Sequence, residues 1–276
     1  MPRARNGAVE LEYQTFGQGA ETILLVNGLG SQMTRWPEAF CDLLVAQGYR
    51  AVRMDNRDVG LSSWLTDAYT LSDMSDDAVA VLDAVGAPRA HIVGVSMGGM
   101  IVQRMAIDHS HRVMSMTSIM SATGATGTLN STPEAMAVLN VAPPDPTADF
   151  AAFLDHGVAN ALTIGSPHYP WPSGDLRARV DAEYRRGFNP PGVARQRAAI
   201  MADGDRTPEL KALNIPTVVL HGANDPLIQP FGGEATAAAI PAAELRMIAG
   251  MGHDMPPALY DVFLDAICAA VSRATA

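Results

Sequence analysis

The sequence predicts an α/β protein: a mostly parallel sheet of about eight strands, helices on both faces, and an inserted helical lid. Short apolar runs alternate with helix-like segments up to about residue 122 and again after residue 206. Between these points prolines punctuate short helical pieces, and no strong strand pattern occurs. We therefore expect a core of residues 1–122 and 206–276, with a lid at 123–205.

The first half of the chain supplies five of the expected strands. Continuously apolar runs are typical of strands buried on both faces, whereas residues 9–16 alternate like an edge strand. Thr70 and Asp73 predict a capping box at the start of one helix. In chain order we expect strands at 9–16, 23–26, 51–54, 91–95 and 114–120, and helices at 39–46, 71–85 and 97–107.

The remaining elements follow the same two periodicities. The proline-rich middle shows only helical spacing, and the strand–helix alternation then returns. We expect lid helices at 148–162, 175–186 and 193–202, then strands at 217–220 and 245–248, and helices at 234–240 and 257–272.

The stretch Gly94-Val95-Ser96-Met97-Gly98 lies between a predicted strand and a predicted helix. A strand–Gly-x-Ser-x-Gly–helix turn is so sharp that only small residues fit at its glycines, and it holds the serine hydroxyl out at the end of the sheet. The following helix directs its first amides toward that hydroxyl. The alternative is a tight glycine turn with an incidental serine. We favour Ser96 as a nucleophile because both flanking elements are present.

A serine nucleophile needs a base and an acid that orients the base. Asp225 follows the strand at 217–220, and His253 lies in a glycine-flanked loop after the strand at 245–248, which is the expected chain order. His221 is a candidate site-lining residue, and Asp254 is expected to point away. The other five histidines are read as surface or satisfied polar residues.

The loop Asn27-Gly28-Leu29-Gly30 follows the strand at 23–26. Its glycines allow a ligand to approach the backbone, so the amides of Leu29 and Met97 are the expected oxyanion donors. A phosphate loop is disfavoured because a third glycine and a Lys-Ser/Thr pair are missing. Gly28 and Trp36 are candidate substrate-binding residues, although core packing is favoured for Trp36.

Composition excludes several partners and compartments. The net charge of −10 argues against nucleic acid or an anionic membrane as partner, because both require a basic face. No secretory signal or 18-residue apolar run is visible, and the two cysteines are expected to be reduced. We therefore expect a cytoplasmic protein with a small-molecule substrate. No metal or organic cofactor is expected, and no feature indicates the oligomeric state.

These motifs resemble the α/β-hydrolase superfamily, serine esterase type, over essentially the whole chain. The resemblance also includes an Asp-x-Arg-x-x-Gly-x-Ser stretch at 55–62, which it marks as structural. Members commonly have histidine where this chain has Asn27. This difference does not affect the expected triad, but the family pattern then does not define the geometry of the oxyanion loop. Residues 55–58 and 108–113 are similar to the aclacinomycin methylesterase-like branch, which implies a carboxylic ester substrate.

The predicted activity is ester hydrolysis through an acyl-enzyme on Ser96. The resemblance equally allows a lactonase, a carbon–carbon bond hydrolase or a cofactor-free haloperoxidase (perhydrolase). A ligand receptor with slow turnover is the non-enzyme alternative. Aromatic residues and methionines of the lid predict a pocket for small to medium apolar esters, although most are expected to pack the lid onto the core. They are Met136, Phe150, Phe153, Tyr169, Trp171, Tyr184, Phe188 and Met201.

Overall fold

Eight strands form one sheet in the computed structural model, which describes residues 2–275. Their spatial order is β1-β2-β4-β3-β5-β6-β7-β8; β3 to β8 run parallel, and β1 and β2 are antiparallel at one edge. The predicted fold class is confirmed. In chain order the strands are β1 Arg3–Asn6, β2 Val9–Phe16, β3 Thr22–Val26, β4 Arg50–Met54, β5 Ala90–Val95, β6 Val113–Ile119, β7 Thr217–Gly222 and β8 Glu244–Ile248.

The helices follow the strands as expected for repeated βα units. The capping box of α2 forms, because Thr70 Oγ1 accepts from the Asp73 amide at 3.1 Å and Asp73 accepts from the Thr70 amide at 2.7 Å. The sequence prediction missed β1, α4 and α8. The helices are α1 Glu38–Ala46, α2 Leu71–Ala84, α3 Met97–Asp108, α4 Pro133–Asn140, α5 Phe150–Ile164, α6 Ser173–Arg186, α7 Pro190–Asp203, α8 Thr207–Leu210, α9 Phe231–Ala239 and α10 Tyr260–Thr275.

Each central strand buries its two faces in two different cores. In β3, Ile23 and Leu25 pack with the cluster of α1 and α10, whereas Leu24 and Val26 pack with the cluster of α2 and α3. Side chains alternate along a strand, so an unbroken apolar run fills both cores. This double burial holds the ends of the parallel strands, where the candidate site lies, in fixed positions.

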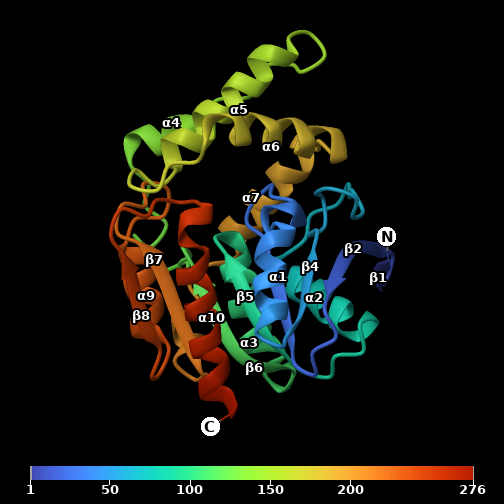
Figure 1. Cartoon of the computed structure of the whole chain (residues 1–276), viewed down its shortest axis with the longest axis vertical. Coiled ribbons are helices and arrows are strands. Elements are labelled where there is room, and N and C mark those ends of the chain that lie inside the picture. Colours follow the sequence, from blue (N-terminus) through green and yellow to red (C-terminus); the bar gives the residue numbers. More distant parts are fainter. Residues whose placement is uncertain (1, 276) are drawn as a thin grey trace.

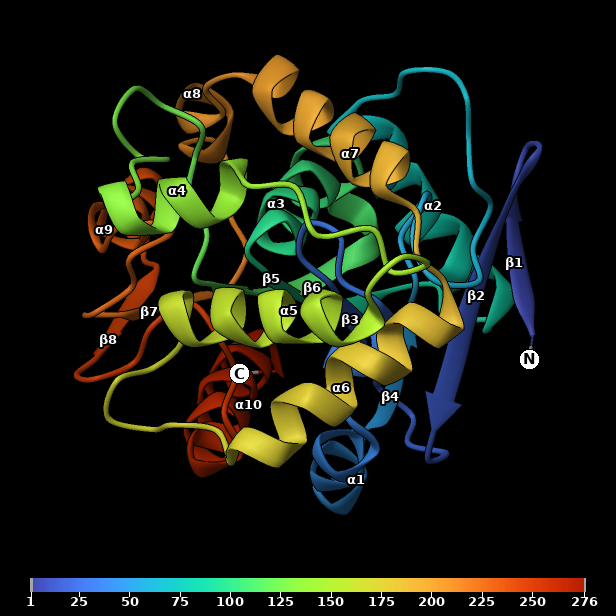
Figure 2. The ribbon, with the colours of Figure 1, turned by 90° about the horizontal axis from the view of Figure 1, so that it is seen from above.

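Helices α4 to α7 lie in the chain between β6 and β7, and no strand occurs among the described residues of that segment. Figure 1 shows α4, α5 and α6 as a layer beyond one end of the strands, with α7 leading back to the core. Seen from above, α5 and α6 cross over the central strands (Figure 2). We call residues 123–205 the lid, following the expected boundaries. No helix within residues 2–275 is long and apolar enough to cross a bilayer.

Candidate active site

Ser96 occupies the turn between β5 and α3 in a backbone conformation that side chains rarely adopt. Its φ is 56° and its ψ is −122°. A Cβ on Gly94 would overlap the Gly98 carbonyl, and a Cβ on Gly98 would overlap the Val26 carbonyl. The two glycines are therefore required by close backbone contacts, as the sharp turn predicts. The strain at Ser96 is maintained by the packed strands around it.

The backbone of Ser96 is also held by the neighbouring strand. Its amide donates to the Ile119 carbonyl at 2.9 Å, and its carbonyl accepts from Ser121 Oγ at 2.8 Å. These contacts come from the end of β6 and the residues that follow it. The serine hydroxyl therefore starts from a fixed backbone position, which is what a preorganised nucleophile requires.

His253 and Asp225 come together with Ser96 at the ends of three strands. His253 Nε2 lies 3.0 Å from Ser96 Oγ, and His253 Nδ1 lies 2.7 Å from Asp225 Oδ2. A carboxylate only accepts hydrogen bonds, so the Asp225 contact favours the proton on Nδ1, and in that tautomer Nε2 can accept from the serine hydroxyl. This arrangement has the geometry in which an imidazole can remove the serine proton.

The Asp225 carboxylate is fixed on its other side by the backbone. Its Oδ1 accepts from the amides of Leu227 and Ile228 at 2.8 and 2.9 Å, and the residue is buried. Oδ2 remains directed at His253. The carboxylate can therefore hold the imidazole in one orientation and stabilise a positive charge on it.

His221 lies close to Asp225 but is oriented by another group. Its Nε2 donates to the Ile228 carbonyl at 2.7 Å and lies 3.5 Å from Asp225 Oδ2. Burial lowers the pKa of His221, so the ring is neutral near pH 7. His221 thus supports the loop that carries Asp225 and does not touch Ser96.

Asp254 follows His253 but faces the lid, as predicted. It accepts from Ser166 Oγ, which in turn accepts from the Gly252 amide at 2.9 Å. Burial raises the pKa of the Asp254 carboxyl. The His253 amide donates to the Ile164 carbonyl at 2.7 Å, so the loop with the candidate base is attached to the lid on both sides of the histidine.

One predicted oxyanion amide belongs to Met97, which follows the serine, and the other to Leu29, whose neighbour Gly28 packs against the serine. Gly28 packs against Ser96, because a Cβ added to it would lie 3.1 Å from Ser96 Cβ. The Leu29 amide donates to no group among the described residues. Met97 is the first residue of α3, and amides of a first helical turn have no partner within the helix. Neither amide thus has a hydrogen-bond partner among the described residues.

Asn27 secures the start of this loop through its amide groups. Its Nδ2 donates to the Met54 carbonyl at 3.1 Å, and its own carbonyl accepts from Asn56 Nδ2 at 2.9 Å. The loop is thereby fastened to the chain that leaves β4. Burial of both asparagines keeps water from competing for these bonds.

Trp36 lies in the core, the placement favoured from the sequence, and does not line the cavity between lid and core. Its side chain is fully buried, packs on Phe40 with ring centroids 5.5 Å apart, and belongs to the core between the sheet, α1 and α10. A short 3-10 helix, Met33–Arg35, turns the chain inward before it. The indole fills the core because α1 begins two residues later.

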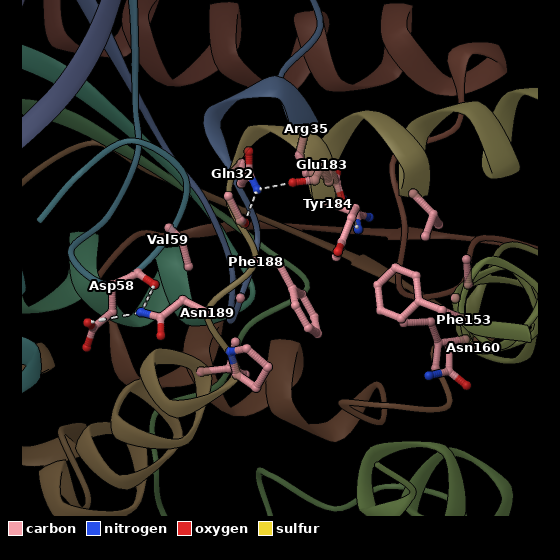
Figure 3. A pocket seen from close by; sticks show the side chains of 18 residues that line it. Gln32, Arg35, Asp58, Val59, Phe153, Asn160, Glu183, Tyr184, Phe188 and Asn189 are labelled. Atoms are coloured by element: carbon pink, nitrogen blue, oxygen red, sulfur yellow. Dashed lines mark hydrogen bonds and ion pairs between the residues drawn. The ribbon is translucent and has the colours of Figure 1, made fainter. Parts of the chain in front are cut away.

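A cavity of about 300 Å³ lies between the lid and the core (Figure 3). Phe153, Tyr184 and Phe188 contribute aromatic lining, and Tyr184 packs against both phenylalanines. Ser96 is not among the lining residues. Gly30, which follows Leu29, and Ile164, which binds the His253 amide, do line it. The cavity therefore borders the loops that hold the candidate catalytic groups.

The polar residues in this lining largely bind one another. Gln32 Nε2 donates to the Glu183 carbonyl at 2.8 Å, Arg35 Nη2 lies 2.9 Å from Glu183 Oε2, and Asn189 Nδ2 donates to the Asp58 carbonyl at 3.0 Å. The dashed lines in Figure 3 mark such pairs. These polar groups are already paired, and apolar atoms provide most of the surface that lines the cavity.

A second cavity of about 330 Å³ lies between α4, the chain after it and α5. It shares Phe153, Gly157, Asn160 and Ile164 with the first cavity. Of the other predicted lid residues, Met201 is exposed and lines neither cavity. In residues 2–275 no three His, Cys, Asp or Glu side chains are grouped as metal ligands are.

Comparison with known proteins places this geometry in a family. A family model described as the alpha/beta hydrolase fold matches residues 21–256. The chain belongs to this family. It is 27% identical over 295 residues to rhodomycin D methylesterase DnrP of Streptomyces peucetius, covering 98% of this chain and 97% of that protein.

Two solved structures extend the comparison. Est816, described as an N-acyl homoserine lactone degrading enzyme, superposes with a TM-score of 0.73 at 25% identity, covering all of both chains. A meta-cleavage product hydrolase from Pseudomonas fluorescens IP01 gives a TM-score of 0.80 at 19% identity, covering 99% of this chain and 98% of that one. The second likeness supports the fold alone. The chain is thus a hydrolase with esterase-like relatives.

Proposed function

We propose that the protein hydrolyses carboxylic esters through a Ser96–His253–Asp225 triad and an acyl-enzyme. The observation that carries the proposal is the unbroken path from Ser96 Oγ through His253 to Asp225, with contacts of 3.0 and 2.7 Å. Each of the three side chains follows a different parallel strand, where ligands of such sheets bind. The methylesterase relative supports an ester as the substrate.

In the first half of the reaction, Ser96 Oγ attacks the ester carbonyl carbon while His253 Nε2 takes the hydroxyl proton. The carbonyl oxygen becomes an oxyanion, and the amides of Leu29 and Met97 donate to it. Asp225 stabilises the imidazolium. The tetrahedral intermediate collapses when His253 gives its proton to the departing alkoxide, which leaves the acyl group on Ser96.

In the second half, His253 removes a proton from water, and the water oxygen attacks the acyl carbon. The same two amides bind the new oxyanion. His253 then returns the proton to Ser96 Oγ as the carboxylic acid forms. The enzyme ends each cycle unchanged, and the residues described here account for every proton transfer.

The aromatic cavity supports small to medium apolar groups as the preferred substrate part. A volume of about 300 Å³ is at the lower end of the range for small-molecule sites. Free Cys41 and Cys268 are consistent with the cytoplasmic location we propose. A lactone is the second candidate substrate, because a relative of similar length is described as degrading one.

Steady-state hydrolysis of p-nitrophenyl esters from acetate to decanoate tests the proposal, with Ser96→Ala beside wild type. We expect the variant to lose at least about a thousandfold in kcat. Ser72→Ala removes a surface hydroxyl on α2 and should match wild type. Absence of wild-type turnover at every chain length would rule out a general esterase and direct the assay to lactones.

A further inference from the structure

Gln196 of α7 is fully buried, although its side-chain amide has two polar atoms, Oε1 and Nε2, to satisfy. Its Oε1 accepts from the Gly30 amide at 2.8 Å, and its Nε2 donates to the Arg57 carbonyl at 2.8 Å. A buried amide that binds two backbone groups at good distance holds those groups in fixed positions. One side chain of the lid therefore joins two separate loops of the core.

The loop it holds is the one that presents the Leu29 amide. Gly30 has a φ of 64°, and the Gly28 carbonyl accepts from the Ser31 amide at 3.2 Å. In a planar trans peptide the N–H points opposite to the C=O, so this bond directs the Leu29 N–H away from Ser31. Gln196 fixes the next peptide, between Leu29 and Gly30. The direction of the Leu29 N–H therefore depends on the bonds at both neighbouring positions.

We propose that Gln196 is a positioning residue for the oxyanion site: from the lid, it holds the Gly30 amide so that the Leu29 amide faces the reacting oxygen. This inference rests on the proposed function. The lid then shapes the substrate cavity and also completes the electrostatic part of the site. Val193, one turn earlier on α7, packs over the same loop, 3.1 Å from where a Gly30 Cβ would lie.

The neighbour of Gln196 provides a matched control. Arg195 also joins α7 to the core, through Asp58 at 2.8 and 2.9 Å, and among the described residues it makes no hydrogen bond or ion pair with residues 27–31. Arg195→Met should therefore loosen the same helix without releasing the Gly30 amide. Gln196→Met keeps the length of the side chain and removes both hydrogen bonds.

The test measures kcat and KM for a p-nitrophenyl ester and the Ki of an alkyl trifluoromethyl ketone, which forms a tetrahedral oxyanion on the serine. Removing one oxyanion donor outright costs about 10²- to 10³-fold in kcat. For a displaced donor we expect about 10- to 100-fold lower kcat in Gln196→Met, with KM within about threefold of wild type. The Ki should rise by a similar factor. Arg195→Met should keep kcat and Ki within about threefold, even if its melting temperature falls.

Equal losses in the two variants, or a wild-type kcat in Gln196→Met, would overturn the proposal. If Gln196→Met does not fold, amide hydrogen exchange in the wild-type protein tests whether Gln196 holds the Gly30 amide. The Gly30 amide should then exchange as slowly as the interior amides of α7, and fast exchange would contradict the proposal. An active Ser96→Ala variant would instead refute the proposed function, so the two failures are distinguishable.

Discussion

The site at the carboxyl ends of the central strands, which carries Ser96, and the lid are held in place by different means. At the site, a strained backbone, two glycines without room for a Cβ and short hydrogen bonds hold each group. The lid is attached largely by charged and amide side chains that cross to the core. The comparison teaches that tight local backbone geometry fixes the position of Ser96, whereas long-range side-chain contacts hold the lid and shape the cavity between lid and core.

Two buried carboxylates show how the lid is attached. Asp55 pairs with Arg186 at 2.6 Å and also accepts from the Met33 amide at 2.7 Å, and Asp58 pairs with Arg195 at 2.8 Å. The segment at 55–62, marked as structural by the family resemblance, thus anchors the lid. It also fixes the chain that follows the oxyanion loop.

The largest effect should come from the acid of the proposed triad. Asp225→Asn keeps the shape of the side chain but favours the wrong histidine tautomer, so we expect kcat to fall by about 10⁴-fold. Asp254→Asn changes the carboxylate next to His253, which binds Ser166 of the lid. It should stay within about tenfold of wild type. Comparable losses of kcat in the two variants would show that Asp225 is wrongly assigned as the acid.

The next effect concerns the stability of the lid attachment. Arg186→Met leaves Asp55 buried without its cation, which costs about 3–5 kcal/mol in such pairs. Arg185→Met removes an exposed pair with Asp181 on the same helix and should cost less than about 1 kcal/mol. Urea denaturation at pH 7 measures both free energies of unfolding. A similar small loss in both variants would show that the Asp55 pair does not hold the lid.

The pH dependence of Arg186→Met follows from the same carboxyl. Burial raises the pKa of Asp55, and Arg186 opposes that rise. Without Arg186 the folded-state pKa rises further above its unfolded value, so the native state binds more protons and stability falls as pH increases. We therefore expect the variant to regain part of its lost stability between pH 7 and pH 5, as followed by the melting temperature. A constant difference from wild type across this range would contradict the assignment.

The smallest effect should be a change of substrate preference. Phe153 lines both cavities, so Phe153→Ala should join them and favour longer acyl chains. We expect the ratio of kcat/KM for decanoate over acetate to rise about tenfold, because added methylenes in an apolar pocket contribute about 1–3 kcal/mol. Phe231→Ala is the control, since Phe231 is exposed and lines neither cavity. An unchanged ratio would show that the acyl group does not bind in these two cavities.

The sequence predicted the site best where the position of a residue depends on a local element, such as the strand or turn next to it. Ser96, Asp225 and His253 each follow a predicted strand, and the parallel sheet brings strand ends together without any knowledge of side-chain packing. The glycines of the elbow carry the same kind of local signal. The expected lid helices at 148–162, 175–186 and 193–202 each fall on a helix of the structure.

The sequence was less informative where long-range contacts decide. Trp36 follows the predicted oxyanion loop and was therefore a candidate for the pocket as well as for the core, because the direction of its indole depends on packing against α1 and α10. Gln196 carries no periodic or motif signal, and its role depends on Gly30, which lies 166 positions away in the chain. In the structure Gln196 shares the buried side of α7 with Gly192 and Ala199, a placement that the sequence pattern does not mark.

Labelling with diethyl p-nitrophenyl phosphate tests the central claim most directly. Mass spectrometry of the digested protein should show one diethylphosphoryl group, on Ser96, and His253→Ala should slow its formation strongly because the base is missing. A label on another residue, or equal labelling rates in wild type and His253→Ala, would contradict the proposed triad.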